Sequence, residues 1–299
     1  MALLSEDSNM TDVKLMIATL NQILQHLDVA RTASENQEVA TNFLLWRQLL
    51  KDDRCSNRER LEQFGAKCYS QNDEDGIVIE LFRRIGTTNR RFVEFGVENG
   101  TENNTLLWLK QGWTGLWIDG SPAHAQSIRE QFSATIASKQ LTFIEAMITA
   151  ENIEALFSQA NFSGEIDLLC IDVDGNDYHL FNAIKSLNPR VVVTEYNAKF
   201  PPPVVWTMPY RADHLWNGTD WFGASLQSMA ELYARKGYTL VSCNISGVNA
   251  FFVRNDLVGN HFVDAGNVRA LYQPPRYFLA SKLFAHIGGH PCDPRMGGG

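Results

Sequence analysis

The chain has 299 residues, of which 44% are hydrophobic and 20% charged, an ordinary composition for a globular protein with one large α/β domain and appendages. Its formal net charge of -8 and pI near 5.4, without a basic stripe, argue against a nucleic-acid partner. A small-molecule substrate fits this charge better.

The cysteines and the apolar runs predict the cellular setting. The five cysteines are scattered without a C-x-x-C pair, which indicates reduced thiols and a cytoplasmic protein. The N-terminus lacks a basic region followed by an apolar one, so no signal peptide is expected. No uninterrupted apolar run reaches the roughly 20 residues of a membrane span, so no membrane partner is predicted.

Apolar residues at helical spacing predict two amphipathic helices, over residues 10–32 and 36–62. Together they form a predicted N-terminal arm over residues 1–64. Two interpretations are equally supported. The arm is either a lid or homo-oligomerisation element, or a pair of helices packed on the core.

The central motif is a strand, a glycine turn and a helix start. An apolar run from Phe92 ends at Gly96, and a short loop through Gly100 leads into a helical pattern. Glycines let the backbone approach a ligand, and free N–H groups at a helix start face it. Asp119 ends the next apolar strand, about twenty residues on, where a Rossmann-like unit holds a ribose diol. The motif therefore predicts a nucleoside-cofactor site.

Strands and helices alternate through the rest of the chain, which predicts a parallel, doubly wound sheet. The remaining strands are expected over residues 141–147, 166–174, 190–197, 238–243 and 249–254. The last two read as an antiparallel pair. The predicted domain covers residues 65–258, followed by an extension over 259–299. In that extension, residues 272–287 have helical character and residues 288–299 form a flexible tail.

Polar residues follow two strands of this sheet. Asp172 and Asp174 end one predicted strand, and Glu195 and Asn197 end the next. Side chains two residues apart in a strand point the same way, so each pair is expected to share a face. If the strands are neighbours, the carboxylates converge, and a divalent cation such as Mg²⁺ would offset their repulsion. The alternative is that Asp174 caps the next helix and Glu195 bonds cofactor, substrate or backbone.

The motif Glu94-x-Gly96-x-x-x-Gly100 resembles the first motif of the class I S-adenosylmethionine (SAM) methyltransferases, and FkbM-type methyltransferases in particular. The resemblance covers roughly residues 65–255. Beyond the first motif it rests on Tyr69-Ser-Gln-Asn-Asp-Glu-Asp-Gly-Ile77, Ile171-Asp-Val-Asp-Gly-Asn176 and Val192-Val-Thr-Glu-Tyr-Asn197. It implies a Rossmann-like seven-stranded sheet whose last strand is antiparallel, with SAM as cofactor. The cofactor residues that it implies are Tyr69, Ser70, Gln71, Glu94, Gly96, Gly100, Asp119, Ala146, Met147 and Asp172.

The resemblance implies O-methylation of a small-molecule hydroxyl, a sugar or a specialised metabolite. Asp172 and Glu195 are the predicted active-centre residues, and Asp172, Glu195 and Asn197 the predicted metal ligands, with Asp174 in reserve. His179 is a candidate general base, although a lone helix histidine is more often a packed or solvated residue.

A long loop, residues 199–221, contains three tryptophans and is expected to face the substrate, or else to pack on its own rings. Two other functions stay open. A nicotinamide-dependent dehydrogenase would carry G-x-G-x-x-G, which this motif does not satisfy. A non-catalytic binding or scaffold protein would keep the sheet without the chemistry.

Overall fold

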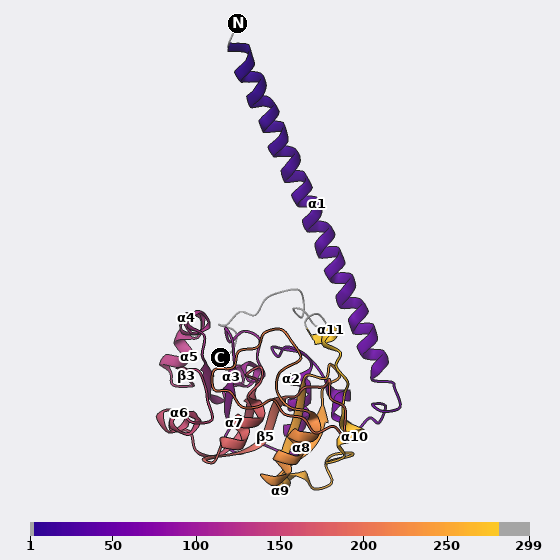
Figure 1. The fold of residues 1–299 in the computed structure, drawn as a ribbon, viewed down its shortest axis with the longest axis vertical. Helices are drawn as coiled ribbons and strands as arrows, with labels where there is room; N and C mark the ends of the chain where they lie inside the picture. Colours follow the sequence, from indigo (N-terminus) through magenta and orange to yellow (C-terminus); the bar gives the residue numbers. More distant parts are fainter. Residues whose placement is uncertain (1–2, 281–299) are drawn as a thin grey trace.

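The computed structural model describes residues 3–280, with side chains for residues 14–279. It shows an α/β body from which one long helix, α1 (Leu3–Leu49), extends away (Figure 1). The strands are β1 (Arg91–Phe95), β2 (Thr114–Asp119), β3 (Leu141–Glu145), β4 (Gly164–Ile171), β5 (Leu187–Glu195), β6 (Tyr238–Cys243) and β7 (Asn249–Arg254). The longer helices of the body are α2 (Glu74–Ile85), α4 (Pro122–Gln131), α6 (Ile153–Gln159), α7 (Asp177–Ala183) and α8 (Leu226–Arg235). The short ones are η1 (Leu61–Phe64), α3 (Leu106–Lys110), α5 (Ser133–Ala137), α9 (Asn255–Val258), α10 (Val268–Leu271) and α11 (Tyr277–Ala280).

The sheet has seven strands in the order β3-β2-β1-β4-β5-β7-β6. The first five strands of the chain run parallel, and β7 is antiparallel to both β5 and β6. This arrangement confirms the predicted Rossmann-like fold with its antiparallel last strand. The order reverses direction at β1, so the crevice between the ends of β1 and β4 is where such folds bind ligands.

Each face of the sheet has its own apolar core, because side chains alternate along a strand. In β1, Phe92 packs into the layer that contains α2, α3 and α4, whereas Val93 packs into the layer that contains α6, α7 and α8. Both side chains are fully buried. The sheet is therefore covered by helices on both faces, which explains the continuous apolar runs of its strands.

The N-terminal prediction of two helices was wrong, since α1 is one continuous helix of 47 residues. Residues 3–49 contain neither glycine nor proline, so no residue interrupts the backbone hydrogen bonds. The chain leaves the helix after Leu49 and turns before η1. The second predicted helix therefore ends about thirteen residues earlier than its apolar pattern indicated.

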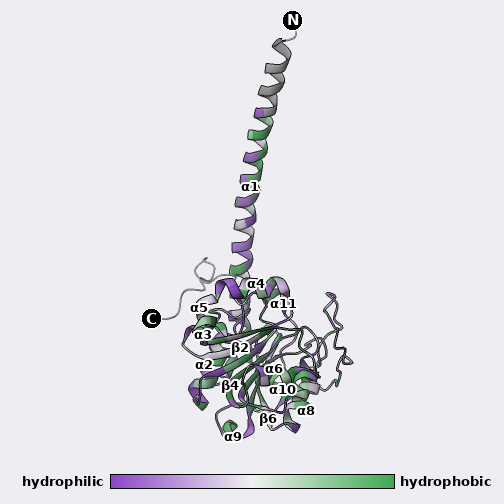
Figure 2. Ribbon diagram, turned by 90° about the vertical axis from the view of Figure 1, so that its left-hand side faces the viewer, coloured by the Kyte–Doolittle hydropathy of each residue, from purple (hydrophilic) through white to green (hydrophobic). Residues whose placement is uncertain are grey.

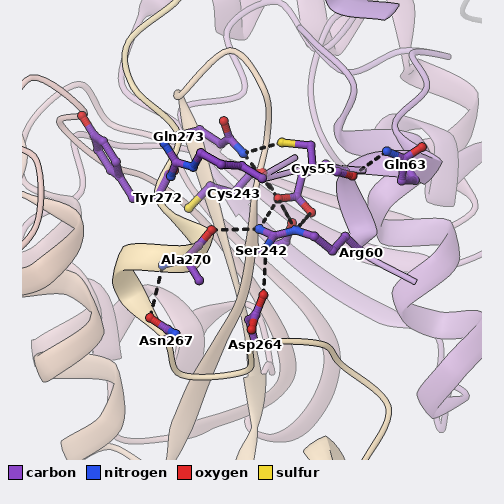
Figure 3. Close-up of polar contacts among 12 residues, drawn as sticks. Cys55, Arg60, Gln63, Ser242, Cys243, Asp264, Asn267, Ala270, Tyr272 and Gln273 are labelled. Atoms are coloured by element: carbon purple, nitrogen blue, oxygen red, sulfur yellow. Dashed lines mark hydrogen bonds and ion pairs between the residues drawn. The ribbon is translucent and has the colours of Figure 1, made fainter. Parts of the chain in front are cut away.

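The segment after β7 is tied to the start of the domain by a buried cluster of polar contacts (Figure 3). The Arg60 guanidinium donates to Glu62 Oε1 at 2.8 Å, to the Ala270 carbonyl at 3.0 Å and to Asp264 Oδ2 at 2.9 Å. Because Arg60 and Glu62 are both buried, this pair fixes the path of residues 264–270. Of the helix predicted over residues 272–287, the described part is α11, and proline precedes it at positions 274 and 275. The predicted tail, residues 288–299, lies outside the described residues.

None of the helices among residues 3–280 combines the length and the apolar character that crossing a membrane requires.

Candidate active site

The glycine loop follows β1 at the carboxyl edge of the sheet, and contacts with neighbouring strands fix its shape. Gly96 has a φ of +70° and donates its N–H to the Ile118 carbonyl at 3.0 Å. A Cβ at this position would lie 1.7 Å from the Asp172 carbonyl oxygen, so only glycine fits. Gly100, at φ +79°, faces the Trp117 ring, which a Cβ would approach to 2.8 Å. The loop is thus pressed against β2 and the end of β4.

The buried Glu94 holds the far end of this loop. Its Oε1 accepts from the Asn104 N–H at 2.9 Å, and its Oε2 accepts from the Thr105 N–H at 3.0 Å and from the Thr105 hydroxyl. Burial raises the pKa of Glu94 to about 7, an effect that these hydrogen bonds partly offset. The carboxylate therefore orders the backbone just before α3, and its contacts are with the chain itself.

Asp119 ends β2 and connects three segments of the crevice. Its Oδ2 accepts from the Glu98 N–H at 2.9 Å, and its Oδ1 accepts from the Ser121 N–H at 2.8 Å. Its main-chain carbonyl accepts from the Ala146 N–H at 3.0 Å, which brings the exit of β3 beside it. Ala146 and the half-exposed Met147 thus lie at the same edge as Asp119. The predicted ribose and adenine positions are neighbours in the structure.

The segment before α2 is ordered by Asp75. One oxygen of this buried carboxylate accepts three main-chain N–H groups, those of Cys68 at 2.7 Å, Tyr69 at 2.6 Å and Ser70 at 2.8 Å. The Ser70 hydroxyl also donates to it. Gln71 is exposed, so its side chain is available to a ligand, whereas Ser70 is fully buried.

Asp172, Asp174 and Glu195 form one group of carboxylates, called here the acid group. One oxygen from each lies within 4.8 Å of the other two. Burial, followed by repulsion from neighbouring acids, raises the pKa of Asp172 and of Glu195 well above the ordinary range. Among the described residues, Glu195 Oε2 is buried without a hydrogen-bond partner. The group brings together three of the four polar residues that the sequence singled out at these strand ends.

The acid group does not arise as the strand pattern predicted, because β4 ends at Ile171 and β5 at Glu195. Asp174 lies beyond β4 in the left-handed region, at φ +54°. The turn is closed by Asp177, whose carboxylate accepts from the N–H groups of Val173 and Gly175. A tight loop, and not a shared strand face, thus brings Asp174 back toward Asp172 and Glu195.

Asn197 and His179 hold the long loop over residues 199–222. The Asn197 amide donates to the carbonyls of Asp220 at 2.9 Å and Phe222 at 3.0 Å. A ring nitrogen of His179 lies 2.7 Å from the Met208 carbonyl, a contact in which the nitrogen donates. Their role as metal ligand and general base stays a prediction, but their observed contacts are with the loop.

The long loop lies against the acid group and exposes apolar side chains. The Asn176 amide donates to the Arg211 carbonyl at 2.8 Å, and His214 Nε2 lies 3.2 Å from the Asp174 carbonyl oxygen. Beyond these anchors, Leu215, Trp216 and Trp221 are each more than half exposed. An apolar surface of this kind beside a polar group is typical of a substrate-binding loop.

The sequence analysis missed a buried polar cluster next to Glu195. Asn249 is paired with Glu195 in the register of β5 and β7, and its amide donates to Glu74 Oε1 at 2.9 Å. The Asn244 amide donates to the same oxygen at 2.8 Å. The two asparagines flank the β6–β7 turn, where asparagine is common, so the pattern indicated only a hairpin.

No protein family and no curated protein matches this sequence. Among solved structures, the chain is similar to a protein described as a caffeoyl-CoA O-methyltransferase from Staphylococcus aureus. The identity is 16%, the TM-score 0.42, and 59% of this chain and 81% of that chain are covered. A protein described as an O-methyltransferase from Klebsiella pneumoniae gives 15% identity, a TM-score of 0.41 and coverage of 74% and 99%.

The Podospora anserina methyltransferase PaMTH1, in a structure with bound S-adenosylhomocysteine, gives 16% identity, a TM-score of 0.39 and coverage of 73% and 87%. Values this low do not carry a function from one protein to another. The function is therefore inferred from the chain's own residues, and the FkbM-type resemblance stays a prediction.

Proposed function

We propose that the protein is a SAM-dependent methyltransferase. The observation that carries this proposal is the crevice at the switch point of the sheet. There the bend at Gly96 and the carboxylate of Asp119 lie side by side, linked through the Glu98 N–H. The glycine bend after β1, ten residues before α3, lets a ligand such as the amino-acid end of a nucleoside cofactor come close to the main chain, and an acid at the end of the next strand suits its ribose diol.

The residues around this crevice each suit one part of SAM. Asp119 would accept the ribose hydroxyls, and Ala146 with Met147 would contact the adenine. Gln71 and Tyr69 lie on the segment that Asp75 orders, and Gly96 and Gly100 shape the loop. Glu94 contributes indirectly, since its oxygens hold the main chain of that loop. SAM supplies an activated methyl group, so the protein has mainly to align an acceptor with it and exclude water.

We propose a hydroxyl group of a small molecule as the acceptor. The acid group adjoins the crevice, because the Asp172 carbonyl oxygen touches the bend at Gly96. The unpartnered oxygen of Glu195 can accept a hydrogen bond from an incoming hydroxyl. The exposed side chains of Trp216 and Trp221 can cover the acceptor and keep water out.

The acid group also fits a divalent cation. Three carboxylate oxygens, one from each residue, lie within 4.8 Å of one another, and Glu195 has a buried oxygen without a partner among the described residues. Carboxylate oxygens are the donors that Mg²⁺ prefers. We propose Asp172, Asp174 and Glu195 as its ligands, in place of the predicted set with Asn197. When bound, the cation would lower the pKa of the acceptor hydroxyl.

Thermal melts test the cation without measuring activity. Mg²⁺ or Mn²⁺ should raise the melting temperature of the wild type and leave that of Asp174→Asn unchanged. Asp213→Asn removes an exposed acid of the long loop and should respond like the wild type. Equal responses of wild type and Asp174→Asn would contradict the cation site.

Calorimetry tests the proposed activity. Titration with SAM should give heat with a stoichiometry of one, and titration with NAD⁺ should give none. Asp119→Asn should weaken SAM binding about tenfold, the loss of one good hydrogen bond. Heat with NAD⁺ alone would favour a dehydrogenase, and no heat with either would favour a non-catalytic binding protein.

We also propose that the protein works in the cytoplasm. Cys55, Cys68, Cys170 and Cys243 are all free thiols in the described structure. Reduced cysteines are typical of that compartment.

A further inference from the structure

The outer part of α1 exposes apolar side chains that no element of the described structure covers. Residues 14–38 are exposed along their whole length, and among the described side chains of α1 only those of Asn42 and Trp46 are buried. The helix meets the body at this C-terminal end (Figure 1). Hydrophobic residues nevertheless recur along the exposed part (Figure 2). The exposed ones between residues 16 and 27 are Met16 76%, Ile17 54%, Leu20 57%, Ile23 49%, Leu24 54% and Leu27 60%.

These side chains gather on one side of the helix and follow the spacing of a coiled coil. Ile17, Leu20, Leu24 and Leu27 are separated by three, four and three residues, which keeps them on one seam. In this register Ile17 and Leu24 occupy a positions, and Leu20 and Leu27 occupy d positions. The β-branched Ile17 at one a position, with leucine at both d positions, favours two strands, whereas Leu24 at the other a position does not discriminate.

Such a helix needs a partner to persist in water. Most helical stability in proteins comes from packing of an apolar face, and α1 packs only its C-terminal end. Single exposed apolar residues are ordinary, but a continuous stripe of them marks an interaction surface. The stripe therefore points to a surface that is covered in the functional protein.

Charge decides which partner fits. Residues 15–27 contain no aspartate, glutamate, lysine or arginine, so the stripe offers nothing to attract a charged partner. The net charge of -8 disfavours an anionic membrane surface, which attracts basic segments. The charged residues just beyond the stripe pair within α1, since Arg31 lies 3.2 Å from Asp28 and 3.8 Å from Glu35. An uncharged apolar stripe is complementary to a copy of itself, as a two-fold symmetric interface requires.

We propose that α1 pairs with α1 of a second copy of this chain in a two-stranded coiled coil, with Ile17, Leu20, Leu24 and Leu27 as its seam. The paired helices form a stalk that joins two catalytic bodies. The seam is short, because Arg31 and Ser34 occupy its next two positions. Pairing therefore depends on protein concentration.

Sedimentation velocity of the full chain tests the pairing. Wild type at high micromolar concentration should sediment with twice the 33.7 kDa of one chain. The double variant Leu20→Glu, Leu27→Glu places like charges in the seam and should sediment as one chain. The matched control Gln22→Glu, Gln25→Glu adds the same charge on the opposite side of the helix and should keep the wild-type mass.

Two further measurements keep the test independent of folding and of the proposed activity. The melting temperature of the body should be the same in both double variants, since neither changes a residue that packs on it. Wild type should not sediment with vesicles of phosphatidylcholine and phosphatidylglycerol. The proposal is overturned if wild type has the mass of one chain at every concentration, if the seam variant keeps the doubled mass, or if vesicles capture the wild type through the stripe.

Discussion

Two sets of carboxylates lie at the carboxyl edge of the sheet, and they differ in what their oxygens contact. Glu94 and Asp119 direct both oxygens at main-chain N–H groups of the loops around them. Asp172, Asp174 and Glu195 face one another instead, and one oxygen of Glu195 has no partner in the described structure.

This difference distinguishes carboxylates that hold loops in place from carboxylates that can take part in a reaction. A buried carboxylate whose two oxygens accept main-chain N–H groups fixes the loops around it, and its remaining lone pairs can still accept a hydrogen bond from a ligand. Carboxylates that repel one another lower the stability of the ligand-free protein, and in the acid group Asp172 and Glu195 are half-buried while Asp174 is exposed. Such a group persists where a proton, a cation or a substrate relieves the repulsion. The comparison predicts that substitutions of Glu94 affect folding most, that substitutions of Asp119 affect both folding and cofactor binding, and that substitutions in the second set affect activity most.

The largest effect is expected at Gly96. Gly96→Ala should lower the free energy of unfolding by at least about 4 kcal/mol, because its Cβ would overlap the Asp172 carbonyl in a backbone conformation that alanine disfavours. Gly237→Ala is the matched control, since Gly237 also has a positive φ but open space around it. Gly237→Ala should lower the free energy of unfolding, measured in urea, by about 1–2 kcal/mol. Equal losses in the two variants would show that the contact with Asp172 is not tight.

Asp172→Asn should separate activity from stability. We expect methyl transfer to fall about 100-fold, the usual loss when an active-site acid or metal ligand is removed. The melting temperature of the ligand-free protein should be unchanged or higher at pH 8, because one of three mutually repelling acids is gone. Radiolabelled methyl transfer and thermal melts measure the two quantities. If the variant is fully active, or is inactive only because it unfolds, Asp172 has a structural role and no direct role in methyl transfer.

Glu94 should make stability depend on pH in a defined direction. Its pKa is raised from 4.5 to about 7 in the folded protein, so the folded state keeps this proton while the unfolded state loses it. Its contribution to stability is therefore complete below about pH 4.5 and is lost as the pH rises to about 7, a change of roughly 3 kcal/mol.

Glu94→Gln removes this titration. Urea unfolding at a series of pH values should show a stability difference between wild type and variant that changes across the interval from pH 4.5 to 7. Both proteins contain the other buried acids, so the pH dependence of stability that those acids cause cancels in the difference. A difference that is constant with pH would mean that Glu94 keeps its ordinary pKa in the fold.

The smallest effect is expected at His179. His179→Gln keeps a donor for the Met208 carbonyl and should leave the pH profile of methyl transfer unchanged. His179→Ala should lower stability by about 1 kcal/mol, the worth of one hydrogen bond. If both variants lose the limb of the pH profile that a base produces, His179 is the general base and the acid group is not.

The sequence allowed the sheet to be predicted because its strands are continuous apolar runs bounded by glycine, such as the run ending at Gly96. It also placed Asp172, Asp174 and Glu195 at neighbouring strand ends. The sequence did not predict how these side chains are arranged in detail. Asp174 reaches the group through a left-handed turn, and the Asn197 amide holds a loop more than twenty residues away. The first depends on a turn that the Asp177 carboxylate closes, and the second on a contact between distant segments, and the strand pattern encodes neither.

A crystal structure of the protein with S-adenosylhomocysteine and Mg²⁺ tests the central claim most directly. The ribose hydroxyls should lie within hydrogen-bond distance of Asp119, the amino-acid end should lie over the bend at Gly96, and the sulfur should face the acid group. A nucleoside bound elsewhere, with the crevice beside Asp119 filled by side chains, would contradict the proposed cofactor site and the methyltransferase activity built on it.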